Sequence, residues 1–185
     1  MIVVGIDASL TSTGVAVTNT ETRNTKTFTV KSSPASPETM TSRVARMDFM
    51  ADSVFDMVIQ EFGVPDAVAI EGPAYAKNTG KVWDRAGLWW TYLRKAMIYP
   101  DVKLLEVTPT TRCKYATGKG NAGKDEVLLA TSRTYPDVEF SNNDEADALI
   151  VMAIMSRLLG EPIEGTLPQN KLDSLKIYKE TEWAQ

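Results

Sequence analysis

Two short apolar segments that each end on a carboxylate constrain the fold of this chain most. Residues 2–7 read IVVGID and residues 66–71 read DAVAIE. Apolar runs of this length, rich in β-branched residues, are typical of strands buried inside a sheet. The first run ends on Asp7 and the second on Glu71. If the two strands are neighbours, both carboxylates lie at one edge of the sheet.

The order of the other expected elements indicates a mixed sheet. Two alternating segments after residue 7, TGVAVTN and KTFTVK, predict a meander of three antiparallel strands. Helical spacing of apolar residues predicts helices at 38–62 and 79–97, and DVKLLEV at 101–107 is a fifth strand. The predicted class is therefore α/β: a central five-stranded mixed sheet, three antiparallel strands followed by two parallel ones, flanked by helices.

The second half of the chain contributes two further acids. A short helix begins at Pro109, a glycine-rich loop GKGNAGK follows, and helices are predicted at 125–135 and 143–159. Asp144 and Asp147 lie three residues apart on the last of these helices, so both can face the sheet. We interpret Asn143 as the cap of that helix.

Domain organisation follows from the length and from a weakening of the pattern after Gly160. The 185 residues are enough for one domain with a single core, which we assign to residues 1–160. Residues 161–185 form a tail of unknown role, with one charged helix expected near 171–182.

Composition excludes several classes of chemistry. The chain has no histidine, which rules out serine–histidine triads, histidine bases and histidine-ligated zinc. It has one cysteine, a start without a basic segment, and no apolar run near the roughly 18 residues that a membrane span needs. These features predict a cytoplasmic protein that does not bind membranes.

Charge is unevenly distributed along the chain. The net charge is −4, yet residues 77–133 hold eleven lysines and arginines against five acids. A basic segment of this kind can neutralise DNA phosphates, although it is also compatible with a solvated surface. The four acids Asp7, Glu71, Asp144 and Asp147 would together hold two magnesium ions, as in enzymes that cut phosphodiesters. Any one of them alone could instead cap a turn or a helix.

Four segments in this order resemble one family. They are GIDASLTSTGVAV, AIEGPAYAKN, VTPTTRCKYATGKGNAGK and DEADALIVMAI. The chain resembles the RuvC-type Holliday-junction resolvases, found in bacteria and their viruses, which have the ribonuclease H-like fold. The resemblance implies an endonuclease that nicks four-way junctions in pairs and leaves 5′-phosphate and 3′-hydroxyl ends. Ala8 and Ser9 replace the usual proline and glycine, and Ala74 stands where an aromatic wedge is usual, so other branched DNA is an expected substrate too.

The resemblance also implies roles for individual residues. Asp7 would bridge two Mg²⁺ ions, for which Mn²⁺ can substitute, Glu71 and Asp147 would complete their coordination, and Asp144 would hold or orient them. Lys124 is a further candidate catalytic residue. The candidate DNA contacts are Tyr75, Lys77, Asn78, Arg112, Lys114, Lys119 and Lys124. The family also implies a homodimer, and three tryptophans at helical spacing, Trp83, Trp89 and Trp90, suit either the core or the dimer interface.

The sequence is also compatible with two other classes of function. Actin-like and sugar-kinase ATPases also begin with a strand that ends on aspartate, so one half of such an ATPase is an alternative, as is a catalytically silent junction-binding module. The segment 118–124 fits the spacing of a phosphate-binding loop. However, Asp125 replaces the required serine or threonine and no strand leads into the loop, so we expect no ATP site there.

Overall fold

A five-stranded mixed sheet forms the centre of the protein. The computed structural model describes residues 1–73 and 81–179. The strands are β1 (Ile2–Asp7), β2 (Ser12–Asn19), β3 (Asn24–Lys31), β4 (Ala67–Glu71) and β5 (Lys103–Val107). They lie in the order β3-β2-β1-β4-β5, antiparallel from β3 to β1 and parallel from β1 to β5. The predicted α/β class and the mixed sheet are therefore confirmed.

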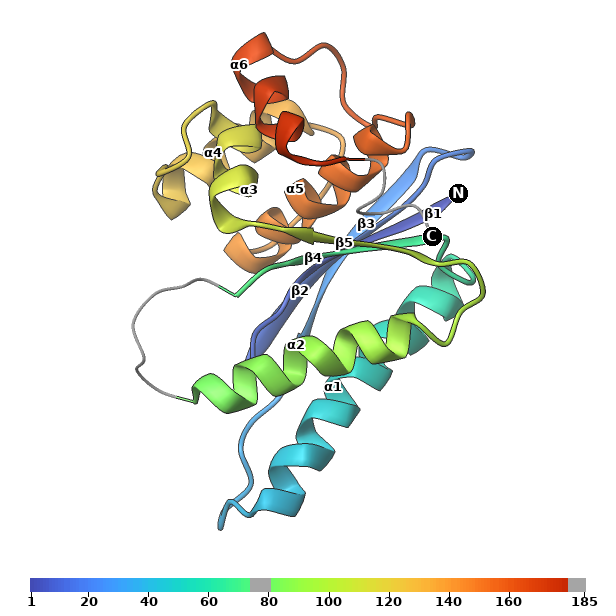
Figure 1. Ribbon diagram of the computed structural model, residues 1–185, viewed down its shortest axis with the longest axis vertical. Coiled ribbons are helices and arrows are strands. Elements are labelled where there is room, and N and C mark those ends of the chain that lie inside the picture. Colours follow the sequence, from blue (N-terminus) through green and yellow to red (C-terminus); the bar gives the residue numbers. More distant parts are fainter. Residues whose placement is uncertain (74–80, 180–185) are drawn as a thin grey trace.

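Helices cover both faces of the sheet (Figure 1). On one face lie α1 (Met40–Glu61) and α2 (Val82–Ala96), and on the other α3 (Pro109–Thr117), α4 (Lys124–Thr134) and α5 (Asn143–Leu158). Within the described residues, none of the helices is long and apolar enough to cross a bilayer.

Alternation along the strands divides the core into two layers. In β1, Val4 and Ile6 point towards α1 and α2, whereas Val3 packs with α5 on the opposite face. Helix α5 lies over the middle of the sheet and buries residues on most of its circumference. This central place explains why its sequence is apolar almost throughout, with acids only in its first two turns.

The caps of two helices fix where they begin. Thr108 accepts a hydrogen bond from the Thr111 amide at 3.2 Å, and Pro109 opens α3. Asn142, not Asn143, caps α5, because its side-chain oxygen accepts from the Glu145 amide at 2.9 Å. The prediction for Asn143 was wrong by one residue: two adjacent asparagines are equivalent in sequence, and only the backbone conformation chooses between them.

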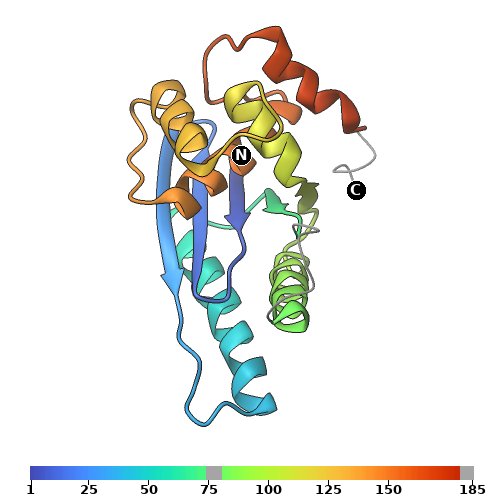
Figure 2. The same cartoon turned by 90° about the vertical axis from the view of Figure 1, so that its left-hand side faces the viewer.

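The tail differs from the single helix expected near 171–182. It contains a short α6 (Gln169–Leu172) and a 3₁₀ turn η1 (Asp173–Ile177), and residues 180–185 lie outside the described part. Figure 2 shows this red segment running beside α3. Lys171 donates to the Ala116 carbonyl at 2.5 Å, near the C-terminus of α3. Leu175 and Tyr178 of the segment pack against the core cluster that includes Tyr115 and Ala116 of α3, so the segment follows the surface of that helix.

Candidate active site

Two parallel strands bring the first two acids together. Strands β1 and β4 are neighbours, and Ile6 pairs with Ile70 in their register. The residues that follow, Asp7 and Glu71, therefore leave the sheet side by side at its carboxyl edge. This is the arrangement that the two acid-ended apolar segments predict.

Helix α5 supplies the next acids because two glycines let it approach the sheet closely. A Cβ atom on Gly14 of β2 would lie 2.0 Å from the Asp144 carbonyl oxygen. A Cβ on Gly5 of β1 would lie 2.3 Å from the Ala148 carbonyl oxygen. The helix backbone thus rests directly on the β1–β2 hairpin, and the first turns of α5 lie over the end of β1.

Three carboxylates converge at this edge. Oxygen atoms of Asp7, Glu71 and Asp147 all lie within 4.8 Å of one another. Asp144 stands beside this group, where it accepts a hydrogen bond from the Ser12 hydroxyl at 2.7 Å. The structure therefore unites three of the four predicted acids and ties the fourth to the start of β2.

The site brings several acidic groups together in a largely buried place. Burial raises the pKa of Asp7 to about 8, and the charges of Glu71 and Asp147 add to that rise. Burial also raises the pKa of Glu71 and of Asp147, an effect that the nearby Arg112 opposes in both. Carboxylates in this state gain from a cation, and oxygen-only ligands suit Mg²⁺ or Mn²⁺.

Arg112 lies inside the acidic group, a place that the sequence does not predict. It projects from α3, and its Nε lies 2.7 Å from Oε2 of Glu71, while its Nη1 pairs with Oδ1 of Asp147. The sequence indicates it only as a DNA contact. No local sequence signal indicates this place, because it depends on how α3 lies over the edge of the sheet.

The other basic candidates lie at different distances from the acids. Lys124, the first residue of α4, is near enough that its charge lowers the pKa of Glu71 and of Asp147 after the larger effects of burial and Arg112. Lys119 is exposed and pairs with Glu126 at 2.9 Å. Lys114 is half-buried on α3. The candidates Tyr75, Lys77 and Asn78 fall outside the described residues.

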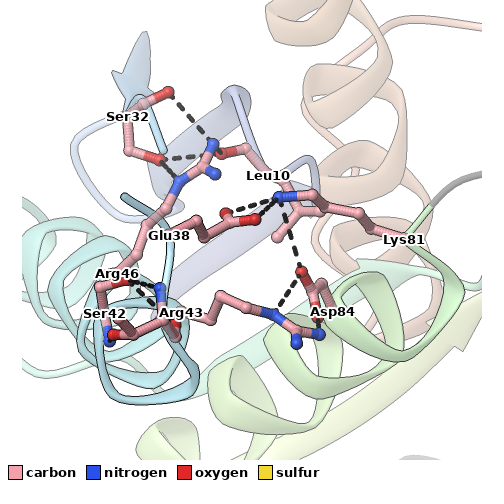
Figure 3. A network of polar contacts seen from close by, with 9 residues as sticks. Leu10, Ser32, Glu38, Ser42, Arg43, Arg46, Lys81 and Asp84 are labelled. Carbon is pink, nitrogen blue, oxygen red and sulfur yellow. Dashed lines mark hydrogen bonds and ion pairs between the residues drawn. The ribbon is translucent and has the colours of Figure 1, made fainter. Parts of the chain in front are cut away.

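A polar network holds the turn that follows Asp7 (Figure 3). Arg46 of α1 donates to the Leu10 carbonyl and to the Ser32 hydroxyl, the latter at 2.8 Å. Beside it, Arg43 pairs with the buried Asp84 at the start of α2. The network links α1, α2 and the β1–β2 turn, which fixes the backbone on one side of the acids.

Comparison with known proteins identifies the family. The family model described as "Crossover junction endodeoxyribonuclease RuvC" matches residues 3–155. The chain belongs to the RuvC family. It is therefore an endonuclease that resolves Holliday junctions, and enzymes of this family depend on a metal ion and work as dimers.

Individual members of the RuvC family agree with this assignment. A RuvC from Rickettsia bellii is 32% identical over 159 residues, which cover 82% of this chain and 94% of that protein. The Thermus thermophilus RuvC structure superposes with a TM-score of 0.63 at 23% identity, covering 89% of this chain and all of the other. The T. thermophilus RuvC in complex with a Holliday junction substrate gives the same TM-score at 21% identity, covering 89% and 99% of the two chains. The ribonuclease H-like fold expected from the sequence is thus confirmed.

Proposed function

We propose that Asp7, Glu71 and Asp147 are the metal ligands of the junction-cleaving site, with Mg²⁺ as the natural ion. The observation that carries this proposal is the convergence of three carboxylates, from β1, β4 and α5, within 4.8 Å. When bound, two such ions would activate a water and neutralise the leaving 3′ oxygen, which gives 5′-phosphate and 3′-hydroxyl ends. Mn²⁺ can replace Mg²⁺ because it prefers the same oxygen ligands.

Asp144 would orient this site from one side. Its carboxylate is held by the Ser12 hydroxyl and lies one helical turn from Asp147. A carboxylate that already accepts a hydrogen bond is fixed in direction, so it can receive a proton or a metal-bound group without first reorganising. Asp144 is therefore proposed as the fourth acid of the site.

The phosphate-binding side would be formed by basic residues of α3, α4 and the loop between them. Lys124 is proposed to neutralise the phosphate being cut, because its charge already acts on Glu71 and Asp147. Lys114 and Lys119 would contact DNA further from the acids. Tyr75, Lys77 and Asn78 remain sequence-based candidates for contacts with the branch point.

The exposed face of α2 is the proposed dimer interface. Four large apolar side chains protrude from this helix and its C-terminal end, exposed by 85%, 60%, 63% and 67%: Trp83, Trp90, Met97 and Ile98. Trp89, by contrast, is buried in the core. Burying such side chains against a second copy would stabilise the dimer, and two sites related by a two-fold axis would cut a four-way junction in pairs.

Paired cleavage in the bacterial or phage-infected cytoplasm is the proposed setting, with other branched DNA as additional substrates. The test is a gel assay on a labelled mobile four-way junction, a replication fork and linear duplex. Wild type should nick the junction symmetrically in Mg²⁺, whereas Ca²⁺ should support binding without cutting, because it lacks the strict geometry of Mg²⁺.

Two substitutions control this assay. Asp7→Asn should abolish cutting, whereas Asp101→Asn, the same change at an exposed turn, should leave it intact. Tight junction binding by wild type without cleavage in Mg²⁺ would contradict the proposal. It would instead support the alternative of a catalytically silent junction-binding module. The ATPase alternative has no support from the family to which the chain belongs.

A further inference from the structure

Arg112 makes the same contacts that a metal ion would make. Its guanidinium approaches Oε2 of Glu71 and Oδ1 of Asp147, two of the carboxylates proposed as ligands. All three side chains are largely shielded from water, with exposed fractions of 11%, 12% and 9% for Arg112, Glu71 and Asp147. A metal ion bound by those carboxylates and the guanidinium of Arg112 would therefore be two cations that compete for the same oxygen atoms.

The contact with Glu71 is close but poorly directed. Nε of Arg112 lies 2.7 Å from Oε2 of Glu71, yet neither atom has a hydrogen-bond partner of good geometry, and both are buried. Hydrogen bonds weaken steeply when they are misaligned, so this pair is held by charge more than by direction. A divalent ion carries twice the charge of the guanidinium and does not depend on the direction of an N–H bond, so it can replace the guanidinium at Glu71.

The surroundings of Arg112 also favour exchange rather than a permanent structural pair. Arginine is not deprotonated in proteins, so it cannot lose its charge when a metal ion arrives and must instead move away. It projects from α3, a helix of nine residues whose far end turns at Gly118 into the glycine-rich loop. The long side chain can withdraw towards solvent by rotation about its own bonds.

We propose that Arg112 is a built-in counter-ion that holds Glu71 and Asp147 together without metal and must be displaced when metal binds. This inference rests on the proposed function, because it takes those two carboxylates as ligands. In the metal-free protein the guanidinium stabilises the fold of the site. In the loaded enzyme its departure lowers the apparent affinity for metal, so Arg112 sets the metal concentration at which the enzyme becomes active.

The test measures Mn²⁺ binding to DNA-free protein at fixed pH by electron paramagnetic resonance. The guanidinium and the ion compete for Oε2 of Glu71 and Oδ1 of Asp147, and a tenfold change in Kd corresponds to about 1.4 kcal/mol. Arg112→Gln should therefore bind Mn²⁺ at least about tenfold more tightly than wild type. Lys114→Gln is the matched control, because it removes one positive charge from the same helix and should change the Kd by less than about threefold.

A second readout is thermal melting with and without metal. In EDTA, Arg112→Gln should melt below wild type, since Glu71 and Asp147 are left without their cation, and saturating Mn²⁺ should raise its melting temperature more than that of wild type. If Arg112→Gln does not fold, Mn²⁺ binding by Arg112→Lys tests the proposal instead. This variant keeps the charge but loses the fork of donors, and should bind Mn²⁺ more tightly than wild type by a smaller factor.

The outcomes separate the two proposals. Mn²⁺ binding by Arg112→Gln that is no tighter than by Lys114→Gln would overturn the counter-ion role while leaving the metal site intact. Mn²⁺ binding that is absent in wild type and in every variant would overturn the metal site itself and the inference with it. Binding seen only in the Arg112 variants would support the counter-ion role in its strongest form.

Discussion

Substitution of Gly14 by alanine should disable the active site through a change that touches no acidic side chain. Gly14 pairs with Asp7 across the β1–β2 hairpin, and the start of α5 rests on its Cα. A Cβ there would lie 2.0 Å from the Asp144 carbonyl oxygen, whereas ordinary contacts begin at 3.4 Å. The helix must therefore retreat by about 1.4 Å, or the strand must move by the same amount.

The size of the effect follows from that displacement. Overpacking of this kind costs about 1–3 kcal/mol of stability. A displacement of about 1 Å in a catalytic group can cost about 100-fold in rate. Since Asp144 and Asp147 move with α5 while Asp7 and Glu71 stay with the sheet, we expect Gly14→Ala to cut a four-way junction at least about 100-fold more slowly while remaining folded at low temperature.

The assay is single-turnover cleavage of a labelled junction in saturating Mg²⁺, with melting followed by circular dichroism. Gly165→Ala is the matched control, because nothing lies within 4 Å of the Cβ that it would add. Cleavage by Gly14→Ala at the wild-type rate, with an unchanged melting temperature, would refute the claim that α5 presses on the hairpin and that this contact positions the acids.

Three further predictions concern the site and the tail. The pKa of Asp7 is raised to about 8 from 3.8, so between these pH values the folded protein binds a proton at Asp7 that the unfolded chain releases. The free energy of unfolding of the metal-free protein should therefore fall as the pH rises between these values, by at most about 1.4 kcal/mol per pH unit. Urea unfolding in EDTA at pH 6, 7 and 8 checks this, and the free energy of unfolding of Asp7→Asn should fall less steeply with pH than that of wild type. Ser12→Ala should slow cleavage by about tenfold, because Asp144 loses a hydrogen bond of 2.7 Å, and an unchanged rate would contradict the claim that Ser12 positions Asp144 for catalysis. The side chain of Glu164 is fully buried against Arg157, Tyr115 and Tyr135. Glu164→Ala should therefore lower the free energy of unfolding by about 3 kcal/mol, whereas Glu161→Ala, at an exposed position, should lower it by less than about 0.5 kcal/mol. Equal urea midpoints for the two variants would contradict this.

The strand ends could be predicted because their signal is local. An apolar run that stops on an acid defines both the strand and the direction in which Asp7 or Glu71 leaves it. Asp147 could be predicted as well, since its spacing from Asp144 places both on one helical face. The approach of Asp7 to Glu71 then follows from the pairing of the two parallel strands.

Contacts between distant elements could not be predicted in the same way. Whether Arg112 faces DNA or the acids depends on how α3 is rotated over the sheet edge, and no local pattern states that angle. Ser12 is likewise an ordinary strand residue until α5 places Asp144 above it. The prediction of a single helix in the tail was wrong because the path of the tail depends on the surface of α3, where Lys171 donates a hydrogen bond to Ala116.

The backbone contact between α5 and the β1–β2 hairpin has a consequence for the newly made chain. Gly5 and Gly14 leave the ribosome well before the helix that rests on them, because that helix ends only at Leu158. Until α5 has been synthesised and has docked, Asp7 and Glu71 have no third carboxylate opposite them. A partly translated chain therefore cannot assemble the cutting site, and nuclease activity begins only when the core is complete.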